Sequence, residues 1–198
     1  NTRLTLAREF RLLASLRHPG VISVLDYGFS ADLETLGLPY YTMEYLPDAK
    51  HITEAIANKS EAARVEMLGA LLEALVYIHR RDILHRDLKP GNVLVVGDRL
   101  CVVDFGLSSL REHVQAGVGN DARGTLAYMA PEVLNAGDQF DITADLYAVG
   151  VIAFEIFAGQ HPFPTHQIRE LLYAIARGDA DFSQIKAAPE LVRMIRRL

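Results

Sequence analysis

Apolar residues recur at helical spacing in two stretches of the first half of the chain. Residues 3–17 predict a helix that ends at His18, because the residue before a proline disfavours the helical region. Its apolar stripe consists of Leu6, Phe10, Leu13 and Leu16. Residues 60–81 predict a longer amphipathic helix, for which Ser60 is a suitable N-cap. The stripe of this second helix consists of Val65, Leu68, Leu72, Leu75 and His79, with His79 expected to be a packed side chain and not a metal ligand.

Short β-branched and apolar runs predict strands between and after these helices. Residues 21–27 and 40–45 are two such runs, and a polar loop separates them. Residues 93–96 and 100–103 flank Gly97-Asp98, a pair suited to a tight hairpin turn. With the turn at that pair, Asn92 lies opposite Val103, and Asp104 follows directly. The hairpin therefore brings an amide and a carboxylate together at its open end.

Helical patterns dominate the last third of the chain. Residues 145–158 are apolar all round, which predicts a buried helix that stops at Gly159. Residues 165–177 predict a second helix, with Leu171, Leu172 and Ile175 facing inward. Pro189 suits the first turn of a last helix. The stripe of this last helix consists of Leu191, Met194, Ile195 and Leu198.

Composition narrows the class of protein. The chain has 198 residues, half of them hydrophobic, and a formal net charge of −5, which argues against nucleic acid and anionic membranes as partners. Its longest apolar run, residues 146–158, is too short for a membrane span and contains Glu155. The single cysteine, Cys101, lies in an apolar strand and is expected to be a small buried side chain. We therefore expect a soluble, cytoplasmic protein without disulfides or a Cys/His metal site.

Several residues around the hairpin have side chains suited to metal binding and acid–base catalysis. Asn92 and Asp104 offer oxygen ligands of the kind that Mg²⁺ takes, with room left for water and phosphate. Just upstream lie a carboxylate, Asp87, and an ammonium group, Lys89. A base, a phosphate-binding cation and a metal pair are thus predicted at one hairpin mouth.

Three motifs in this region resemble those of protein kinases. HRDLKPGN at residues 85–92 resembles the catalytic loop, DFG at 104–106 the metal-binding loop, and APE at 130–132 the end of the activation segment. The residues of these segments resemble most those of eukaryotic-type (Hanks-type) Ser/Thr kinases from bacteria. The resemblance implies an α+β, two-lobed protein kinase-like fold. Residues 1–46 would be part of the small lobe (helix C, strands and hinge), and 47–198 the incomplete, mainly helical large lobe.

The resemblance also implies roles for residues around the catalytic loop. Asp87 would orient the acceptor hydroxyl and take its proton, and Lys89 would follow the moving phosphate. Asn92 and Asp104 would hold Mg²⁺, with Mn²⁺ as an alternative. Thr125 would touch the catalytic Asp and Lys.

Further positions would bind the nucleotide. Glu9 would pair with a lysine one strand earlier, and Met43 would be the gatekeeper. The backbone of Glu44 and Leu46 would contact the adenine edge, and Leu94 would support the ring from below.

Two other features follow from the same resemblance. Asp145 would hold the catalytic-loop backbone by hydrogen bonds. No Ser, Thr or Tyr lies between Leu110 and Gly124, so we expect no ordinary switching by phosphorylation there, and Asp121 could serve as the acidic partner of Arg86. The arginine that pairs with Glu132 in the family would lie beyond Leu198.

The function implied is transfer of the ATP γ-phosphoryl group to a protein Ser/Thr hydroxyl. No Gly-rich loop and no partner lysine for Glu9 occur in the chain, so we expect a truncated domain that is nearly inactive alone. A pseudokinase that acts only as a binding module is the alternative, and the intact Asp87, Lys89, Asn92 and Asp104 argue against it. A small-molecule phosphotransferase of the same fold is disfavoured by APE and by Gly124-Thr125.

Overall fold

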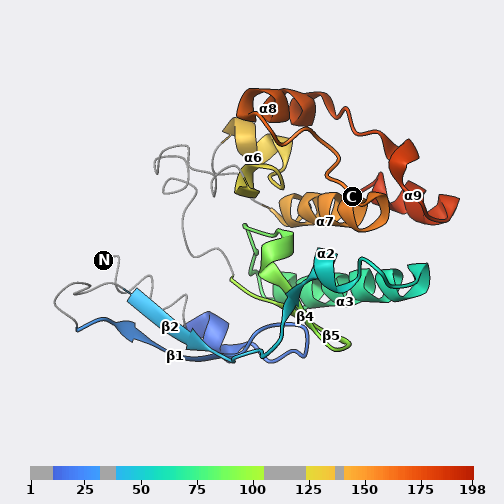
Figure 1. The fold of residues 1–198 in the computed structure, drawn as a ribbon. Coiled ribbons are helices and arrows are strands. Elements are labelled where there is room, and N and C mark those ends of the chain that lie inside the picture. Colours follow the sequence, from blue (N-terminus) through green and yellow to red (C-terminus); the bar gives the residue numbers. More distant parts are fainter. Residues whose placement is uncertain (1–10, 32–38, 105–123, 137–140) are drawn as a thin grey trace.

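A computed structural model describes residues 11–31, 39–104, 124–136 and 141–198. Helical residues 11–15 end before His18, as the sequence predicts. The named elements that follow are β1 (Val24–Phe29), β2 (Pro39–Met43), β3 (Lys50–His51), α2 (Ile52–Ala55), α3 (Glu61–His79), the 3₁₀ turn η1 (Pro90–Asn92), β4 (Val93–Val96), β5 (Arg99–Val102), α6 (Pro131–Ala136), α7 (Ile142–Ala158), α8 (Ile168–Arg177), the 3₁₀ turn η2 (Phe182–Gln184) and α9 (Pro189–Ile195). Strands lie mainly in the first half and helices in the second (Figure 1).

The strands form two small antiparallel sheets. β1 pairs with β2, placing Tyr27 opposite Tyr41, and the other sheet has the order β3-β4-β5. The predicted strand from residue 21 becomes β1 only at Val24, because residues 20–22 bond to β5 instead. Val21 forms a parallel bridge with Val102, and the N–H of Ile22 donates to the carbonyl of Val102 at 3.0 Å. This bridge joins the segment before β1 to the β4–β5 hairpin.

The β4–β5 hairpin has the register that the sequence predicts. Val96 lies opposite Arg99, and Gly97 in the turn has a φ of 60°, which glycine adopts without a steric penalty. The N–H of Val103 donates to the carbonyl of Asn92 at 2.9 Å. Asn92 and Asp104 are therefore brought to the same end of the hairpin, as expected. Cys101, in β5, is 1% exposed, as expected of a buried side chain.

The segment before α3 contains two elements that the sequence did not predict. β3 pairs with β4 through Lys50 and Val95, and α2 follows at once with Ile52 fully buried. The segment is polar and has no clear period, so its structure depends on pairing with β4.

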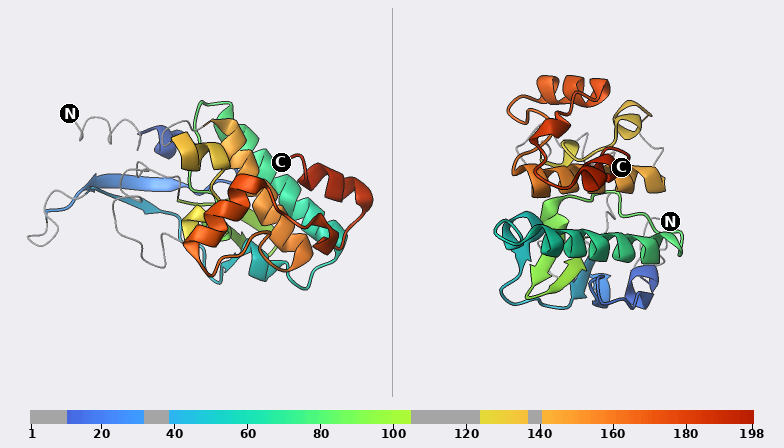
Figure 2. Two further views of the ribbon diagram at one scale, coloured as in Figure 1. Left: turned by 90° about the horizontal axis from the view of Figure 1, so that it is seen from above. Right: turned by 90° about the vertical axis from the view of Figure 1, so that its right-hand side faces the viewer.

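In the right-hand view of Figure 2 the elements stack in layers, with strands at the bottom, then α3, then α7, and α8 at the top. Ser60 caps α3 by accepting a hydrogen bond from the N–H of Ala63. The prediction that Val65 lies on the inward stripe of α3 is wrong, since its side chain is 41% exposed. The buried face is rotated from the predicted one and consists of Leu68, Leu71, Ala74, Leu75 and Ile78.

α7 is the buried central helix that the sequence predicts. Asp141 caps its start, and Gly159 ends it in the left-handed conformation with a φ of 75°. One continuous core includes Leu71 of α3, Val102 of β5 and Ile152 of α7. In α9, Leu191 and Ile195 are buried, but the prediction for Met194 is wrong because it is 40% exposed. None of the described helices combines the length and hydrophobicity that a bilayer crossing requires.

Candidate active site

The loop from His85 to Asn92 connects α3 to β4, and a carboxylate of α7 holds its start. Asp145 is 2% exposed and accepts hydrogen bonds from the backbone N–H groups of His85 and Arg86, both at 2.9 Å. Its Oδ2 also lies 2.8 Å from Nε2 of His79. Burial alone would raise the pKa of Asp145, but these hydrogen bonds outweigh it and leave the pKa below its usual value. The charged carboxylate therefore fixes the loop where Arg86 has a φ of 66°.

His85 connects this loop to the end of β5. Its ring is fully buried, and Nε2 lies 3.0 Å from the carbonyl oxygen of Val103. Because a carbonyl only accepts, Nε2 carries the hydrogen, and Nδ1 can accept from the N–H of Asp87 at 3.4 Å. Burial lowers the pKa of His85, which favours this neutral form. The imidazole thus ties the backbone before Asp104 to the backbone of Asp87.

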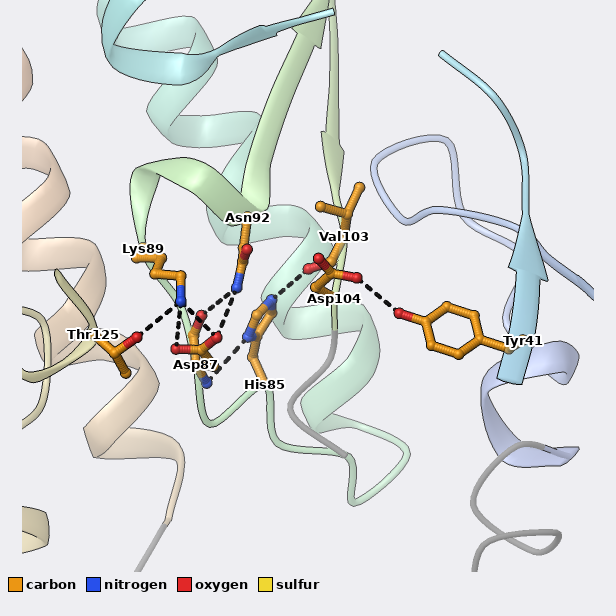
Figure 3. Close-up of polar contacts among 8 residues, drawn as sticks. All are labelled: Tyr41, His85, Asp87, Lys89, Asn92, Val103, Asp104 and Thr125. Carbon is orange, nitrogen blue, oxygen red and sulfur yellow. Dashed lines mark hydrogen bonds and ion pairs between the residues drawn. The ribbon is translucent and has the colours of Figure 1, made fainter. Parts of the chain in front are cut away.

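Four of the predicted site residues form one hydrogen-bonded cluster (Figure 3). Nζ of Lys89 lies 2.9 Å from Oδ2 of Asp87 and 2.9 Å from Oγ1 of Thr125. Nδ2 of Asn92 donates to the carbonyl oxygen of Asp87 at 2.7 Å and to its Oδ2 at 3.1 Å. Thr125 comes from the distant stretch before α6, so Lys89 joins the His85–Asn92 loop to that stretch.

The Asn92 amide and the Asp104 carboxylate lie at the same end of the β4–β5 hairpin, and each offers an oxygen that could bind a metal. Because both partners of Nδ2 are acceptors, the nitrogen of Asn92 must face Asp87, and its oxygen remains an acceptor. Asp104, with a φ of 52°, accepts a hydrogen bond on Oδ1 from the hydroxyl of Tyr41 at 2.7 Å. Two oxygen-bearing side chains suit Mg²⁺, which usually keeps several waters or phosphate oxygens. In the described part of the chain, no cluster of three or more His, Cys, Asp or Glu side chains could hold a metal.

The predicted adenine-binding segment follows β2. Met43 ends β2 and is 40% exposed, and the N–H of Glu44 donates to the carbonyl of Ser23 at 2.9 Å. The carboxylate of Glu44 accepts two hydrogen bonds from the guanidinium of Arg99, at 2.8 and 3.3 Å. Arg99 also donates to the carbonyl of Pro19 at 3.0 Å and thereby connects the hinge segment to the β4–β5 turn.

Of four further predicted residues, two lie in the described part of the chain and two do not. Leu46 is partly buried against the core, and so is Leu94, which pairs with Cys101 in the β4–β5 hairpin. Glu9 lies outside the described residues, as does Asp121.

A cavity of about 470 Å³ is lined in part by Pro90 of the His85–Asn92 loop. Pro90, Tyr128 and Glu155 are among its lining residues, and the Tyr128 hydroxyl donates to the Glu155 carboxylate at 2.8 Å. Burial raises the pKa of Glu155 above its usual value. The N–H of Tyr128 in turn donates to the carbonyl of Thr125, which places this hollow next to the Asp87 cluster.

Sequence reasoning did not find the roles of several polar residues. His79 was predicted to be packed, which it is, but its bond to Asp145 was not foreseen. Tyr41 and Arg99 were not singled out at all. Alternate residues of a strand point the same way, so Tyr41 shares a strand face with Met43. This two-residue period could have indicated from the sequence that Tyr41 faces the predicted site.

Comparison with known proteins agrees with this geometry. The model of the protein kinase domain matches residues 1–194. The chain belongs to the protein kinase family. Its relatives include CBL-interacting protein kinase 5 of Oryza sativa subsp. japonica, 33% identical over 90% of this chain and 38% of the relative. They also include the DNA damage-responsive serine/threonine-protein kinase RqkA of Deinococcus radiodurans, 36% identical over 86% of this chain and 26% of the relative.

The fold of this kinase chain has a counterpart among solved structures. The structure of Rad53 1-466 in complex with AMP-PNP superposes with a TM-score of 0.76 at 26% identity, over 96% of this chain and 48% of that one. The protein kinase fold predicted from the sequence is therefore confirmed, as is the resemblance to Ser/Thr kinases. This kinase chain spans well under half the length of the two relatives named above.

Proposed function

We propose that this chain is the catalytic part of a Ser/Thr protein kinase, which transfers the γ-phosphoryl group of ATP to a hydroxyl of a protein substrate. The observation that carries the proposal is the cluster in which Lys89 bridges Asp87 and Thr125 at 2.9 Å each. Phosphoryl transfer depends on positioning and charge neutralisation more than on covalent chemistry. A carboxylate, an ammonium group and an oxygen donor pair around one loop meet that need.

In the proposed reaction, the acceptor hydroxyl oxygen forms a bond to the γ-phosphorus while the bond from that phosphorus to the β–γ bridging oxygen breaks. Asp87 accepts a hydrogen bond from the acceptor hydroxyl and takes its proton, and ADP leaves. Lys89 neutralises charge on the transferred group, and Thr125 fixes the Lys89 ammonium. Because Asn92 donates to Asp87, it also holds the rotamer of the base.

Asn92 and Asp104 would hold Mg²⁺, or Mn²⁺ in its place. Bound there, the metal would neutralise charge on the phosphate oxygens. The adenine would contact the backbone of Glu44 and Leu46 beside Met43, with Leu94 beneath it. Glu9 is proposed to pair with a lysine side chain.

The two-lobe arrangement is part of the same proposal. Residues 1–46, with β1 and β2, would belong to the small lobe, and 47–198, with the buried α7, to the large lobe. Nucleotide would then enter between the β2 end and the β4–β5 hairpin. The acceptor peptide would approach from the side of Tyr128 and Glu155.

Labelled-ATP transfer to a generic protein substrate tests the function in the full-length protein. Asp87→Asn should lower the rate by about 10²-fold or more, because it removes the proton acceptor. Asp82→Asn is the matched control, since Asp82 is exposed and its φ of 58° suits asparagine equally. Mg²⁺-dependent transfer that survives in Asp87→Asn would refute Asp87 as the base. Folded protein that binds ATP but transfers nothing would instead indicate a pseudokinase.

A further inference from the structure

Tyr41 and Asp104 lie 63 positions apart, yet the Tyr41 hydroxyl donates to Oδ1 of Asp104 at 2.7 Å. In Figure 3 the carboxylate of Asp104 points to Tyr41 on one side of His85, whereas Asn92 points to Asp87 on the other. Within the described part of the chain, the Tyr41 hydroxyl is the group that hydrogen-bonds to the Asp104 side chain. This contact joins the β2 strand to the proposed metal ligand.

We propose that Tyr41 is a positioning residue, which orients the Asp104 carboxylate for the metal–nucleotide complex. The inference rests on the proposed function, because it assumes that Asp104 binds the metal. A carboxylate has about four lone-pair sites, so one hydroxyl on Oδ1 leaves Oδ2 fully available. The hydrogen bond fixes the rotation of the carboxylate without occupying the oxygen that a metal would take.

The surroundings of Tyr41 suit such a role. Its ring is partly buried against the main core, and its backbone pairs with Tyr27 of β1. Asp104, by contrast, is exposed and follows the end of β5 in the left-handed conformation. The partly buried phenol therefore orients an exposed carboxylate, as partners of metal-ligating carboxylates generally do. Tyr41 also lies two residues before Met43, so one strand connects the adenine end of the site to the metal end.

Tyr41→Phe in the full-length protein tests the inference, because it removes one hydroxyl and keeps the ring. Tyr40→Phe is the matched control: Tyr40 is the neighbouring tyrosine, 47% exposed, and its ring packs at Gly28. The first readout is the affinity for a non-hydrolysable ATP analogue, measured by calorimetry with and without Mg²⁺. The second is the Mg²⁺ concentration that gives half-maximal phosphotransfer.

We expect Tyr41→Phe to raise the Mg²⁺ requirement about 10-fold or more, the usual effect of losing a partner of a metal ligand. Metal-free nucleotide affinity should stay within about twofold, because no adenine contact changes. Tyr40→Phe should match wild type in both measurements. An unchanged Mg²⁺ requirement in Tyr41→Phe would overturn the inference, and a lowered one would show that the hydroxyl competes with the metal.

Two further measurements separate this inference from the proposed function. Asp104→Asn should remove the Mg²⁺-dependent part of nucleotide binding, and wild-type protein without such a part would refute the proposed function itself. Tyr41→Met serves as a second variant should Tyr41→Phe lower the unfolding temperature. It also lacks the hydroxyl and must give the same increase in Mg²⁺ requirement for the inference to stand.

Discussion

The imidazole of His79, at the end of α3, lies 2.8 Å from the carboxylate of Asp145, in the first turn of α7. The same carboxylate accepts hydrogen bonds from the backbone N–H groups of His85 and Arg86. The helices α3 and α7 and the loop that begins at His85 thus meet at one buried carboxylate. Because unpaired buried polar groups are costly, this junction is expected to govern both stability and loop geometry.

Asp145→Asn is expected to lower the free energy of unfolding by about 2–4 kcal/mol, because the charge is lost and an amide NH₂ then faces a donor. Urea unfolding measures the change. Asp141→Asn is the control on the same helix, since Asn and Asp cap helices about equally well. Equal stability of the two variants would show that the buried carboxylate contributes little.

The pH dependence of stability is expected to include a term from His85. Burial holds its folded pKa below 6.5, so below that pH the unfolded chain binds a proton that the native state excludes. Its stabilising contribution is therefore present above pH 6.5 and falls as the pH decreases, by up to about 1.4 kcal/mol per pH unit. Asp145 adds no slope here: its lowered pKa gives stability that is present above 3.8 and lost only as the pH falls through the folded pKa.

Histidine NMR combined with urea unfolding between pH 5 and 8 checks this prediction. The His85 ring signal, assigned with His85→Gln, should titrate with a midpoint below 6.5, because burial lowers its pKa. His51, which is exposed, serves as the internal comparison in the same spectra. A His85 ring that titrates with a midpoint near 6.5 would contradict the prediction.

Thr125→Ala is expected to lower kcat about 10-fold with little change in the KM for ATP. The variant removes the hydroxyl that holds the Lys89 ammonium, and a hydrogen bond to a charged group contributes about 1.5 kcal/mol or more. Thr125→Ser keeps that hydroxyl and should retain most of the rate. Steady-state kinetics of the two variants in the full-length protein test this prediction. A Ser variant as slow as the Ala variant would show that the hydroxyl of residue 125 does not position Lys89.

The Arg99–Glu44 pair is expected to stabilise the segment that we propose to bind adenine. Both side chains are partly exposed, so we expect a favourable coupling of about 0.2–1 kcal/mol in a double-mutant cycle of Arg99→Gln and Glu44→Gln. Salt at 1 M should reduce the coupling. Nucleotide affinity should fall about threefold in Arg99→Gln, equivalent to about 0.7 kcal/mol.

Arg177→Gln is the control for this cycle, since Arg177, at the end of α8, forms a surface ion pair with Asp179, which follows that helix. Its nucleotide affinity should match wild type. A coupling energy of zero at low salt would show that the Arg99 guanidinium does not stabilise Glu44.

The local pattern of turn, apolar and polar residues was enough to predict the elements nearest the proposed active site. The Gly97-Asp98 turn and the two-residue period of the flanking strands set the hairpin register, so the proximity of Asn92 and Asp104 followed from the sequence. The uniformly apolar stretch before Gly159 determined that α7 is buried, and the catalytic-loop motif indicated the family. Such features depend on residues close together in the chain.

Only the tertiary structure decided which distant residues meet. Asp145 reaches a loop about 60 positions earlier and Tyr41 reaches Asp104 across 63, and no local period specifies either contact. The same holds for the face of α3, where Val65 is exposed although it fits the helical spacing. Periodicity sets which residues share a face, whereas the packing of separate elements sets how that face is turned and which polar groups it meets.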